Sequence, residues 1–323
     1  MKAILIEEFG GPEVLKLKDI PAPPTPPGGL LIEVSRAGVN YADTHQAENS
    51  YLAPAQLPLV PGAEVVGVVS DGPADWLGRR VVALVNGGGY AAQAVTTPAL
   101  AFPIPDGVGD AAALALVLQG STAWHLLRTS GHLAAGETVV VHAGAGGVGS
   151  LAVQLAKRWG AGRVIATASS EAKRDLARRL GADETVDANT DDMTAALRAA
   201  NGGAPVDIVL EMTGGRIFDE SLKALAPFGR LVTYGMASRR PGTPLTAAEL
   251  MSRSRAVIGF WLAHCFTRPA MMSAAMDELI ALTAAGSLCP VVGGEYPLSQ
   301  AREAHEAIRS RATTGKLVLD PAG

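Results

Sequence analysis

The spacing of apolar residues in the first part of the chain differs from that in its middle. Its first hundred residues contain short β-branched runs that glycine and proline interrupt at short intervals. Regular interruption of this kind predicts the strands of an antiparallel, barrel-like domain. We expect these strands at residues 3–6, 15–17, 30–38, 64–70, 80–85 and 90–95.

From residue 137 onward, apolar runs alternate with segments that have the period of an amphipathic helix. This alternation predicts a parallel, doubly wound sheet with right-handed crossovers. We expect its strands at residues 137–143, 162–168, 184–187, 206–210, 229–235 and 255–262.

The remaining segments suggest how the two regions are joined. Two alanine-rich helices are expected at 111–118 and 121–127, separated by a break at Gln119-Gly120. The last part of the chain predicts helices at 271–285 and 299–310 and strands at 291–296 and 316–319. Its pattern of apolar and polar residues is closer to that of the first region than to that of the middle. A chain of 323 residues usually forms more than one core. We therefore predict an α/β protein with a β-rich domain of residues 1–118 and 269–323 and a dinucleotide-binding domain of residues 119–268.

A glycine-rich turn lies between the first predicted parallel strand and its helix. It reads GAGGVG and contains the GxGxxG pattern at Gly144, Gly146, Gly147, Val148 and Gly149. Glycines allow the tight turn and a close approach of the backbone to a ligand, and the N-terminus of the following helix favours a pyrophosphate. Because strand, turn, helix and second strand follow in order, we predict binding of a nicotinamide dinucleotide.

The end of the second parallel strand favours NADPH over NADH. An acidic residue usually stands about 20 residues after the turn in NAD-binding folds, whereas this chain has Ala168 followed by Ser169 and Ser170. These hydroxyls and Lys173 suit a 2′-phosphate. Glu171 argues against this prediction. The competing interpretation is that a serine only caps the next helix and that Lys173 is a solvated charge.

Composition sets the broad class. The net charge is −4, which leaves no basic excess for nucleic acid. No apolar run is long enough to span a membrane, and the N-terminus lacks the apolar core of a signal peptide. Only Cys265 and Cys289 are present, which indicates a reducing compartment. We therefore expect a cytoplasmic enzyme that acts on a small molecule, without nucleic-acid or membrane partners.

Several longer segments are more specific than the glycine turn. They read MKAILIEEFGGPEVL, RAGVNYADTHQAENSY, VPGAEVVGVV, AGAGGVGSLAVQLAK, LGADETVD, FDESLKALAPFGRLVTYG and TTGKLVLDP. In them the chain resembles, from end to end, the zinc-independent quinone oxidoreductase branch of the medium-chain dehydrogenase/reductases. The resemblance implies a discontinuous GroES-like catalytic domain together with a Rossmann domain.

The comparison with zinc-dependent alcohol dehydrogenases of the same superfamily concerns two positions. Those enzymes place a Cys in the segment 38–43 and a His in the segment 61–64, where this chain has Asn40 and Ala63. The chain also lacks the four closely spaced cysteines of a structural zinc lobe. We expect no metal site.

The resemblance also implies which residues serve the reaction. It places Asn40 near the nicotinamide ribose and Tyr41, Asp43 and Tyr51 at the substrate pocket. We expect the proton to come from water or a nearby hydroxyl, with Tyr51 as the best single candidate. The alternatives are that Asp43 caps a helix that starts near Thr44 and that Tyr51 is a surface aromatic of a loop.

Further cofactor contacts are expected from both regions. The resemblance implies roles for Thr122 and Lys316, although helix packing and a plain surface lysine are the competing interpretations. The ends of successive strands at the cofactor face add Thr213, Gly214, Tyr234, Gly235 and Phe260.

Without zinc to polarise a carbonyl, the reaction must use acceptors that already take hydride well. Quinones and α,β-unsaturated carbonyls are such acceptors, so we predict NADPH-dependent reduction of one of them. The alternatives are a C=C reductase of a biosynthetic, polyketide-type intermediate and, more remotely, a non-catalytic nucleotide-binding protein. The apolar segment 254–262 is predicted to form an uncovered sheet edge, and so a homodimer is expected.

Overall fold

The computed structural model describes residues 1–323, which form two compact units. The first unit comprises Met1–Ser121 and Cys265–Gly323, and the second comprises Thr122–His264. The domain boundaries predicted from the sequence lie between residues 118 and 119 and between residues 268 and 269. The α/β class, with a β-rich domain and a parallel-sheet domain, is confirmed. No helix combines the length and the apolar character that a membrane span requires.

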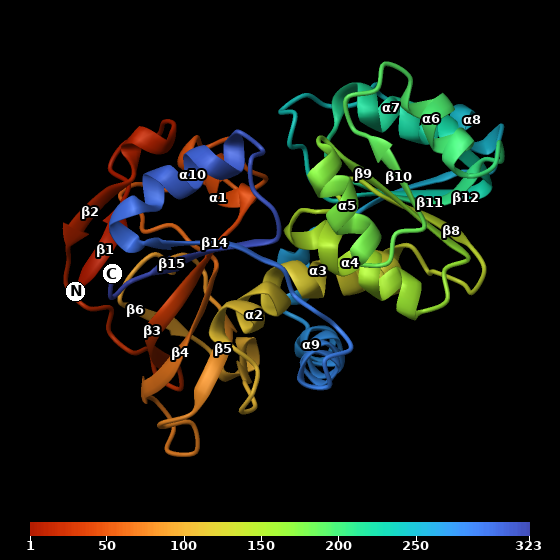
Figure 1. The fold of residues 1–323 in the computed structure, drawn as a ribbon. Coiled ribbons are helices and arrows are strands. Elements are labelled where there is room, and N and C mark those ends of the chain that lie inside the picture. Colours follow the sequence, from red (N-terminus) through yellow and green to blue (C-terminus); the bar gives the residue numbers. More distant parts are fainter. The chain divides into compact units, whose positions relative to one another are not determined.

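The first unit is built around a seven-stranded sheet in the order β14-β15-β3-β4-β5-β7, with β6 also paired to β3 (Figure 1). Its strands are β3 (Leu30–Val39), β4 (Glu64–Asp71), β5 (Arg80–Leu84), β6 (Gln93–Thr96), β7 (Ala101–Pro103), β14 (Val292–Pro297) and β15 (Lys316–Asp320). A separate antiparallel pair joins β1 (Lys2–Leu5) and β2 (Lys16–Asp19). All pairs are antiparallel except β14 with β15.

Strand β15 brings the end of the chain into this sheet. It pairs antiparallel with β3, so that Leu317 lies opposite Val39. On the other side of β3, Ala37 lies opposite Val65 of β4. The first residues of β15 and of β4 therefore flank the end of β3, which is where the polar residues of this unit gather.

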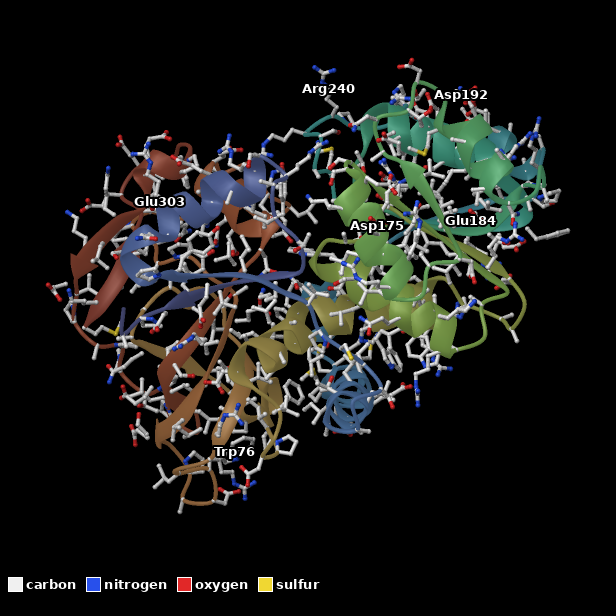
Figure 2. All side chains as sticks on the ribbon, in the orientation of Figure 1. Trp76, Asp175, Glu184, Asp192, Arg240 and Glu303 are labelled. Carbon is white, nitrogen blue, oxygen red and sulfur yellow. The ribbon has the colours of Figure 1, made fainter.

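The helices of the first unit are α1 (Tyr41–Ala47), α2 (Asp110–Ala115), α9 (Pro269–Ala284) and α10 (Ala301–Arg309). Its core includes Ile4, Leu30, Ile32, Leu317 and Leu319, all of them almost fully buried. Trp76, between β4 and β5 (labelled in Figure 2), packs against this core, and the Arg79 guanidinium lies 5.7 Å from its ring centroid.

The second unit contains a six-stranded, fully parallel sheet in the order β10-β9-β8-β11-β12-β13. The strands are β8 (Thr138–Val141), β9 (Arg163–Ala168), β10 (Glu184–Asp187), β11 (Val206–Glu211), β12 (Leu225–Thr233) and β13 (Ala256–Gly259). The helices are α3 (Ser121–His125), α4 (Gly147–Arg158), α5 (Glu171–Arg179), α6 (Met193–Ala200), α7 (Gly215–Ala224) and α8 (Ala247–Met251). Helices α4 and α5 cover one face of this sheet, and α6, α7 and α8 lie on the other (Figure 1).

One expected feature is wrong. Gln119-Gly120 does not break the helical segment, because residues Leu116–Gly120 form a π-helical turn and α3 follows directly. Gly120 is required there for close packing: a Cβ at this position would lie 3.1 Å from a methyl carbon of Leu279 in α9. The glycine therefore permits contact between helices and does not end one.

Candidate functional site

The glycine-rich turn joins β8 to α4 in the second unit. A Cβ at Gly149 would collide with the carbonyl oxygen of Ala143, and one at Gly144 would lie 2.6 Å from the Cβ of Ala166. Ala143 itself has a left-handed φ of 52°. The first intrahelical bond runs from Ser150 N to Gly146 O, which leaves the N–H groups of the first helical residues for a ligand. The turn thus has the shape of an anion cradle.

A buried histidine, not predicted from the sequence, holds the end of β8 beside this turn. His142 Nδ1 lies 3.0 Å from Thr167 Oγ1 of β9, and its Nε2 lies 2.8 Å from Ser221 Oγ of α7. Burial lowers the pKa of His142 to about 4. The neutral ring therefore links two strands and a helix directly before the turn.

Ser169 and Ser170 follow directly after β9, at the end of the second parallel strand. Ser169 and Ser170 are exposed, and Ser170 caps α5 by accepting a hydrogen bond from Lys173 N at 3.4 Å. The side chain of Lys173 is partly buried, which lowers its pKa. Capping by Ser170 is thus present. Contact of these residues with a 2′-phosphate stays a prediction.

The carboxylate of Glu171, which argued against NADPH, is engaged by two arginines. Arg174 Nε donates to Glu171 Oε2 at 2.9 Å, and Arg178 donates to Glu171 Oε1 at 2.7 Å. These hydrogen bonds, first that of Arg178, lower the pKa of Glu171. Its negative charge is therefore compensated within α5 and is not directed alone at the end of β9.

A second buried carboxylate supports the turn after β11. Glu211 Oε1 accepts from Thr213 N at 2.5 Å and from Gly214 N at 2.8 Å, while its Oε2 is buried without a hydrogen-bond partner. Burial raises the pKa of Glu211 to about 7. Gly214 has a φ of 78°, and a side chain there would strike the carbonyl oxygen of Arg240.

The other predicted cofactor residues of this unit lie at or near the carboxyl ends of the strands. Tyr234 and Gly235 follow β12, and Tyr234 N donates to Glu211 O at 3.0 Å. Phe260 follows β13, and its ring stacks on His125 with centroids 5.7 Å apart. Thr122 is buried in α3.

The first unit holds a buried polar network at the end of β3. Lys316 and Glu64 are both 0% exposed and form an ion pair. Lys316 Nζ also donates to Asn40 Oδ1 at 3.1 Å and to Val39 O at 3.3 Å. Asn40 Nδ2 donates to Glu64 Oε1 at 2.7 Å, and Gln119 Nε2 donates to Asn40 Oδ1 at 3.1 Å. The interpretation of Lys316 as a surface lysine is therefore wrong.

Asp43 extends this network toward α10. Its Oδ2 accepts from Asn40 N at 2.8 Å, as the third helical residue of α1, and from Tyr90 OH at 2.8 Å. Tyr90 OH lies 3.0 Å from His305 Nε2. Burial raises the pKa of Asp43 to about 6 and lowers that of His305 to about 4. Asp43 thus takes part in capping α1, but as the third residue of a helix that begins at Tyr41, and the expected helix start near Thr44 is wrong.

The two other candidate catalytic residues surround His45. The rings of Tyr41 and His45 are 5.6 Å apart in an edge arrangement, and those of His45 and Tyr51 are 6.3 Å apart. Both tyrosines are partly exposed. The structure therefore joins Asn40, Asp43 and Lys316 in one network and places Tyr41 and Tyr51 in ring contact with His45.

Six buried residues of the two units were not among the site residues predicted from the sequence: Glu64, Tyr90, Gln119, His142, Glu211 and His305. For Glu64 a signal existed, because a charge begins the apolar strand EVVGVV just as Lys316 begins KLVL. Two opposite charges in otherwise buried strands indicate a buried pair. Gly38 supports it, since a Cβ there would collide with the Glu64 carboxylate.

Comparison with known proteins identifies the family. Residues 26–106 match the alcohol dehydrogenase GroES-like domain, and residues 147–281 match the zinc-binding dehydrogenase family. The chain is 32% identical over 326 residues to the quinone oxidoreductase of Rattus norvegicus, covering 99% of this chain and 97% of that protein.

Solved structures agree with this assignment. A mycobacterial protein determined in complex with NADPH has a TM-score of 0.93 and 36% identity, covering 99% of this chain and all of that one. The quinone oxidoreductase of Escherichia coli, also complexed with NADPH, has a TM-score of 0.93 and 30% identity at the same coverage. The chain is therefore an oxidoreductase and belongs to the quinone oxidoreductase branch of the medium-chain dehydrogenase/reductase superfamily.

Proposed function

We propose that this protein is an NADPH-dependent oxidoreductase that reduces a quinone or another conjugated carbonyl compound without a metal ion. The observation that carries the proposal is the β8–α4 turn, in which glycines leave room that side chains would fill. NADPH-bound relatives at 30 and 36% identity support the choice of cofactor.

The chain's residues fit the cofactor in both of its charged regions. The N-terminus of α4, at Gly147 and Val148, would receive the pyrophosphate. Ser169, Ser170 and Lys173 would receive the 2′-phosphate, and the compensated charge of Glu171 removes the repulsion that an isolated carboxylate would exert there. When bound, NADPH supplies the hydride for the reduction.

The preference for NADPH can be tested at Lys173. Loss of a charge-assisted contact costs about 1.5–3 kcal/mol, so Lys173→Ala should weaken NADPH binding roughly tenfold or more and leave NADH binding almost unchanged. Lys157→Ala, on the exposed end of α4, is the control. Equal affinity of the parent protein for both cofactors would contradict the proposed preference.

The proposal of a metal-free reaction rests on the side chains at the end of β3. Asn40 stands where the zinc enzymes have a thiolate, and Ala63 offers no ligand atom. The Lys316 ammonium already neutralises the nearby Glu64 carboxylate. No group of three His, Cys, Asp or Glu side chains has an arrangement suited to a metal ion. The reaction then depends on positioning the acceptor and on hydrogen bonds to its developing enolate.

We assign the contact with the nicotinamide ribose to Asn40 and the final proton transfer to Tyr51, with Tyr41 and Asp43 at the substrate. A panel of quinones, enones and enoyl thioesters, followed by NADPH absorbance, tests the acceptor class. Quinone turnover that survives dialysis against a strong chelator supports the proposal. Loss of turnover on chelation, or rapid oxidation of a saturated alcohol, would refute it. Activity on enoyl substrates alone would favour the C=C reductase alternative.

We further propose a homodimer in the cytoplasm. Strand β13 pairs only with β12 and is an edge of its sheet, with Ala256, Val257 and Ile258 half-buried. An apolar edge of this kind can pair with a second copy. Light scattering at micromolar concentration should give twice the chain mass, and a monomer would contradict the dimer. Neither Cys265 nor Cys289 forms a disulfide, as suits a reducing compartment.

A further inference from the structure

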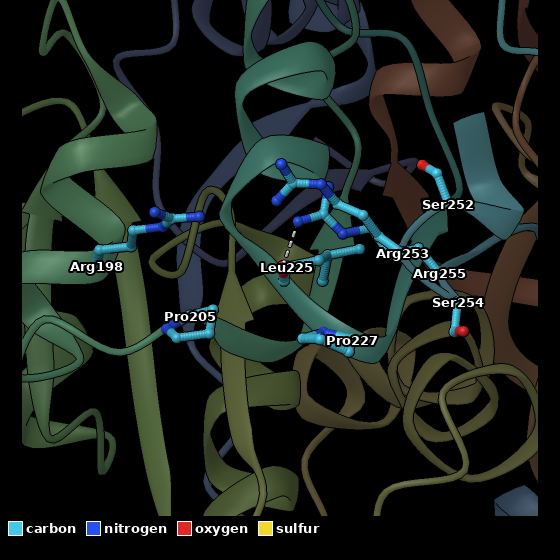
Figure 3. Close-up of a pocket in the computed structure, with 8 residues that line it drawn as sticks. All are labelled: Arg198, Pro205, Leu225, Pro227, Ser252, Arg253, Ser254 and Arg255. Atoms are coloured by element: carbon cyan, nitrogen blue, oxygen red, sulfur yellow. Dashed lines mark hydrogen bonds between the residues drawn. The ribbon is translucent and has the colours of Figure 1, made fainter.

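A polar cavity lies at the amino edge of the parallel sheet in the second unit. It has a volume of about 330 Å³, and its lining includes Leu225, which begins β12, and Arg255, which precedes β13 (Figure 3). The glycine-rich turn follows the carboxyl end of β8, so in this parallel sheet the cavity belongs to the opposite edge. It is therefore separate from the proposed cofactor site.

Three arginines line this cavity, which we call the arginine pocket. Arg198 comes from the end of α6 on one side, and Arg253 and Arg255 come from the segment before β13 on the other (Figure 3). Arg198 and Arg255 both donate to the carbonyl oxygen of Lys223, at 3.1 and 3.4 Å, and Arg255 also donates to Leu225 O at 2.5 Å. Shared backbone acceptors thus hold two guanidinium groups near each other.

The positive charge of the arginine pocket is not balanced within the protein. None of the three arginines forms an ion pair, and no acidic residue lines the cavity. The Nε atoms of Arg198 and Arg255 are buried without a hydrogen-bond partner. Burial, followed by the charges of Arg253 and Arg198, lowers the pKa of Arg255. Like charges crowded in this way are unfavourable unless an anion joins them.

Two carboxylates that line a neighbouring hollow are already engaged. A neighbouring hollow shares Arg253 and Arg255 with the arginine pocket and includes Asp219 and Glu249. Asp219 accepts from the N–H and the hydroxyl of Thr243, both at 2.8 Å. Glu249 accepts from the N–H and the hydroxyl of Thr246, both at 2.7 Å, and caps α8. Neither carboxylate bonds to an arginine of the pocket.

We propose that the arginine pocket binds the phosphate group of a small phosphorylated molecule. Planar guanidinium groups match phosphate oxygens, and the exposed guanidinium of Arg253 makes no hydrogen bond or ion pair within the protein. Ser254 also lines the cavity, whereas the hydroxyl of Ser252 already donates to Glu249 O at 2.9 Å. A volume of 330 Å³ is at the small end of ligand pockets, which suits a compact metabolite. The inference does not depend on the proposed reaction.

Pyrophosphate is the probe for calorimetric titration of the whole protein. Saturating NADPH is present, so that the glycine-rich turn does not compete for the probe. We expect saturable binding of one pyrophosphate per chain. Because each charge-assisted contact is worth one to two factors of ten in affinity, Arg253→Gln should weaken the binding about tenfold to a hundredfold. Its exposed side chain makes no hydrogen bond in the protein, so the variant should fold normally.

Two further variants make the result specific. Arg198→Gln should weaken pyrophosphate binding in the same range, whereas Arg179→Gln, an exposed residue at the end of α5, should leave it unchanged. Circular dichroism checks the fold of each variant. The proposal is overturned if the parent shows no saturable binding, if Arg253→Gln binds as tightly as the parent, or if Arg179→Gln weakens binding equally.

Discussion

Replacement of Lys316 by methionine tests the central structural claim about the first unit. Methionine keeps most of the volume of lysine but removes the ammonium that pairs with Glu64 and donates to Asn40 Oδ1 and Val39 O. Both partners of the ion pair are 0% exposed, so the Glu64 carboxylate would remain buried without its cation. Breaking a buried pair in this way costs about 3–5 kcal/mol.

This loss should be visible in thermal unfolding. For a unit of this size, each kcal/mol lowers the melting temperature by about 2–4 °C, so Lys316→Met should lower it by about 6–20 °C. Urea unfolding followed by circular dichroism gives the free energy independently. Lys157→Met is the matched control, because its pair with Asp183 is exposed on both sides and exposed pairs contribute at most about 1 kcal/mol.

The double variant Lys316→Met with Glu64→Gln separates charge from packing. It removes the unpaired carboxylate, so we expect it to be more stable than Lys316→Met alone by about 2 kcal/mol or more. The reasoning fails if Lys316→Met lowers the unfolding free energy no more than Lys157→Met does. It also fails if the losses from Lys316→Met and Glu64→Gln add in the double variant, because the network is then not held by this ion pair.

Three other predictions follow from buried groups. Burial raises the pKa of Glu211 from 4.5 to about 7, so the native state loses stability as the pH rises through that interval. Glu211→Gln should therefore be more stable than the parent by about 3 kcal/mol at pH 8 and similar to it below pH 4.5. Urea unfolding measures both differences. Burial lowers the pKa of His305 from 6.5 to about 4, so the parent loses stability as the pH falls through that interval. The unfolding free energy of His305→Gln should fall by about 2 kcal/mol less than that of the parent between pH 7 and 4.5. Parallel plots of unfolding free energy against pH for the two proteins would contradict this. Gly149→Ala should weaken NADPH binding at least tenfold in a fluorescence titration, because its Cβ would strike Ala143 O, whereas Gly109→Ala, with nothing within 4 Å, should not.

The parallel-sheet unit could be predicted from the sequence because its signals are local. The strand TVVV and the segment IVL within VDIVLE are apolar runs, as expected for strands buried on both faces, and helices separate such strands along the chain. The glycine-rich turn is equally local, since its pattern lies within six residues. The break predicted at Gly120 was wrong because one glycine can serve either a turn or a close contact, and only the position of Leu279 decides between them.

The buried network could not be predicted in the same way. Lys316 and Glu64 are 252 positions apart, and they meet only because β15 and β4 both pair with β3. His305 and Tyr90 are separated by 215 positions and come from α10 and a loop. Such contacts depend on strand register and helix packing, which no spacing in the sequence encodes. The roles of Asn40 and Asp43 in capping α1 are local, and the sequence alternative foresaw a capping role for Asp43 but placed the start of the helix three residues too late, near Thr44 instead of Tyr41.

The position of Asn40 has a consequence for any attempt to redesign this chain as a zinc enzyme. Its amide receives hydrogen bonds from Lys316 and Gln119 and donates one to Glu64, and its backbone N–H is capped by Asp43. A cysteine at this position would remove three side-chain bonds and bring a thiolate beside an ammonium that already has a partner. Histidine at Ala63 alone would not correct this. Restoring a metal centre would require simultaneous changes at residues that are distant in sequence, because the bonds of Asn40 reach Glu64, Gln119 and Lys316.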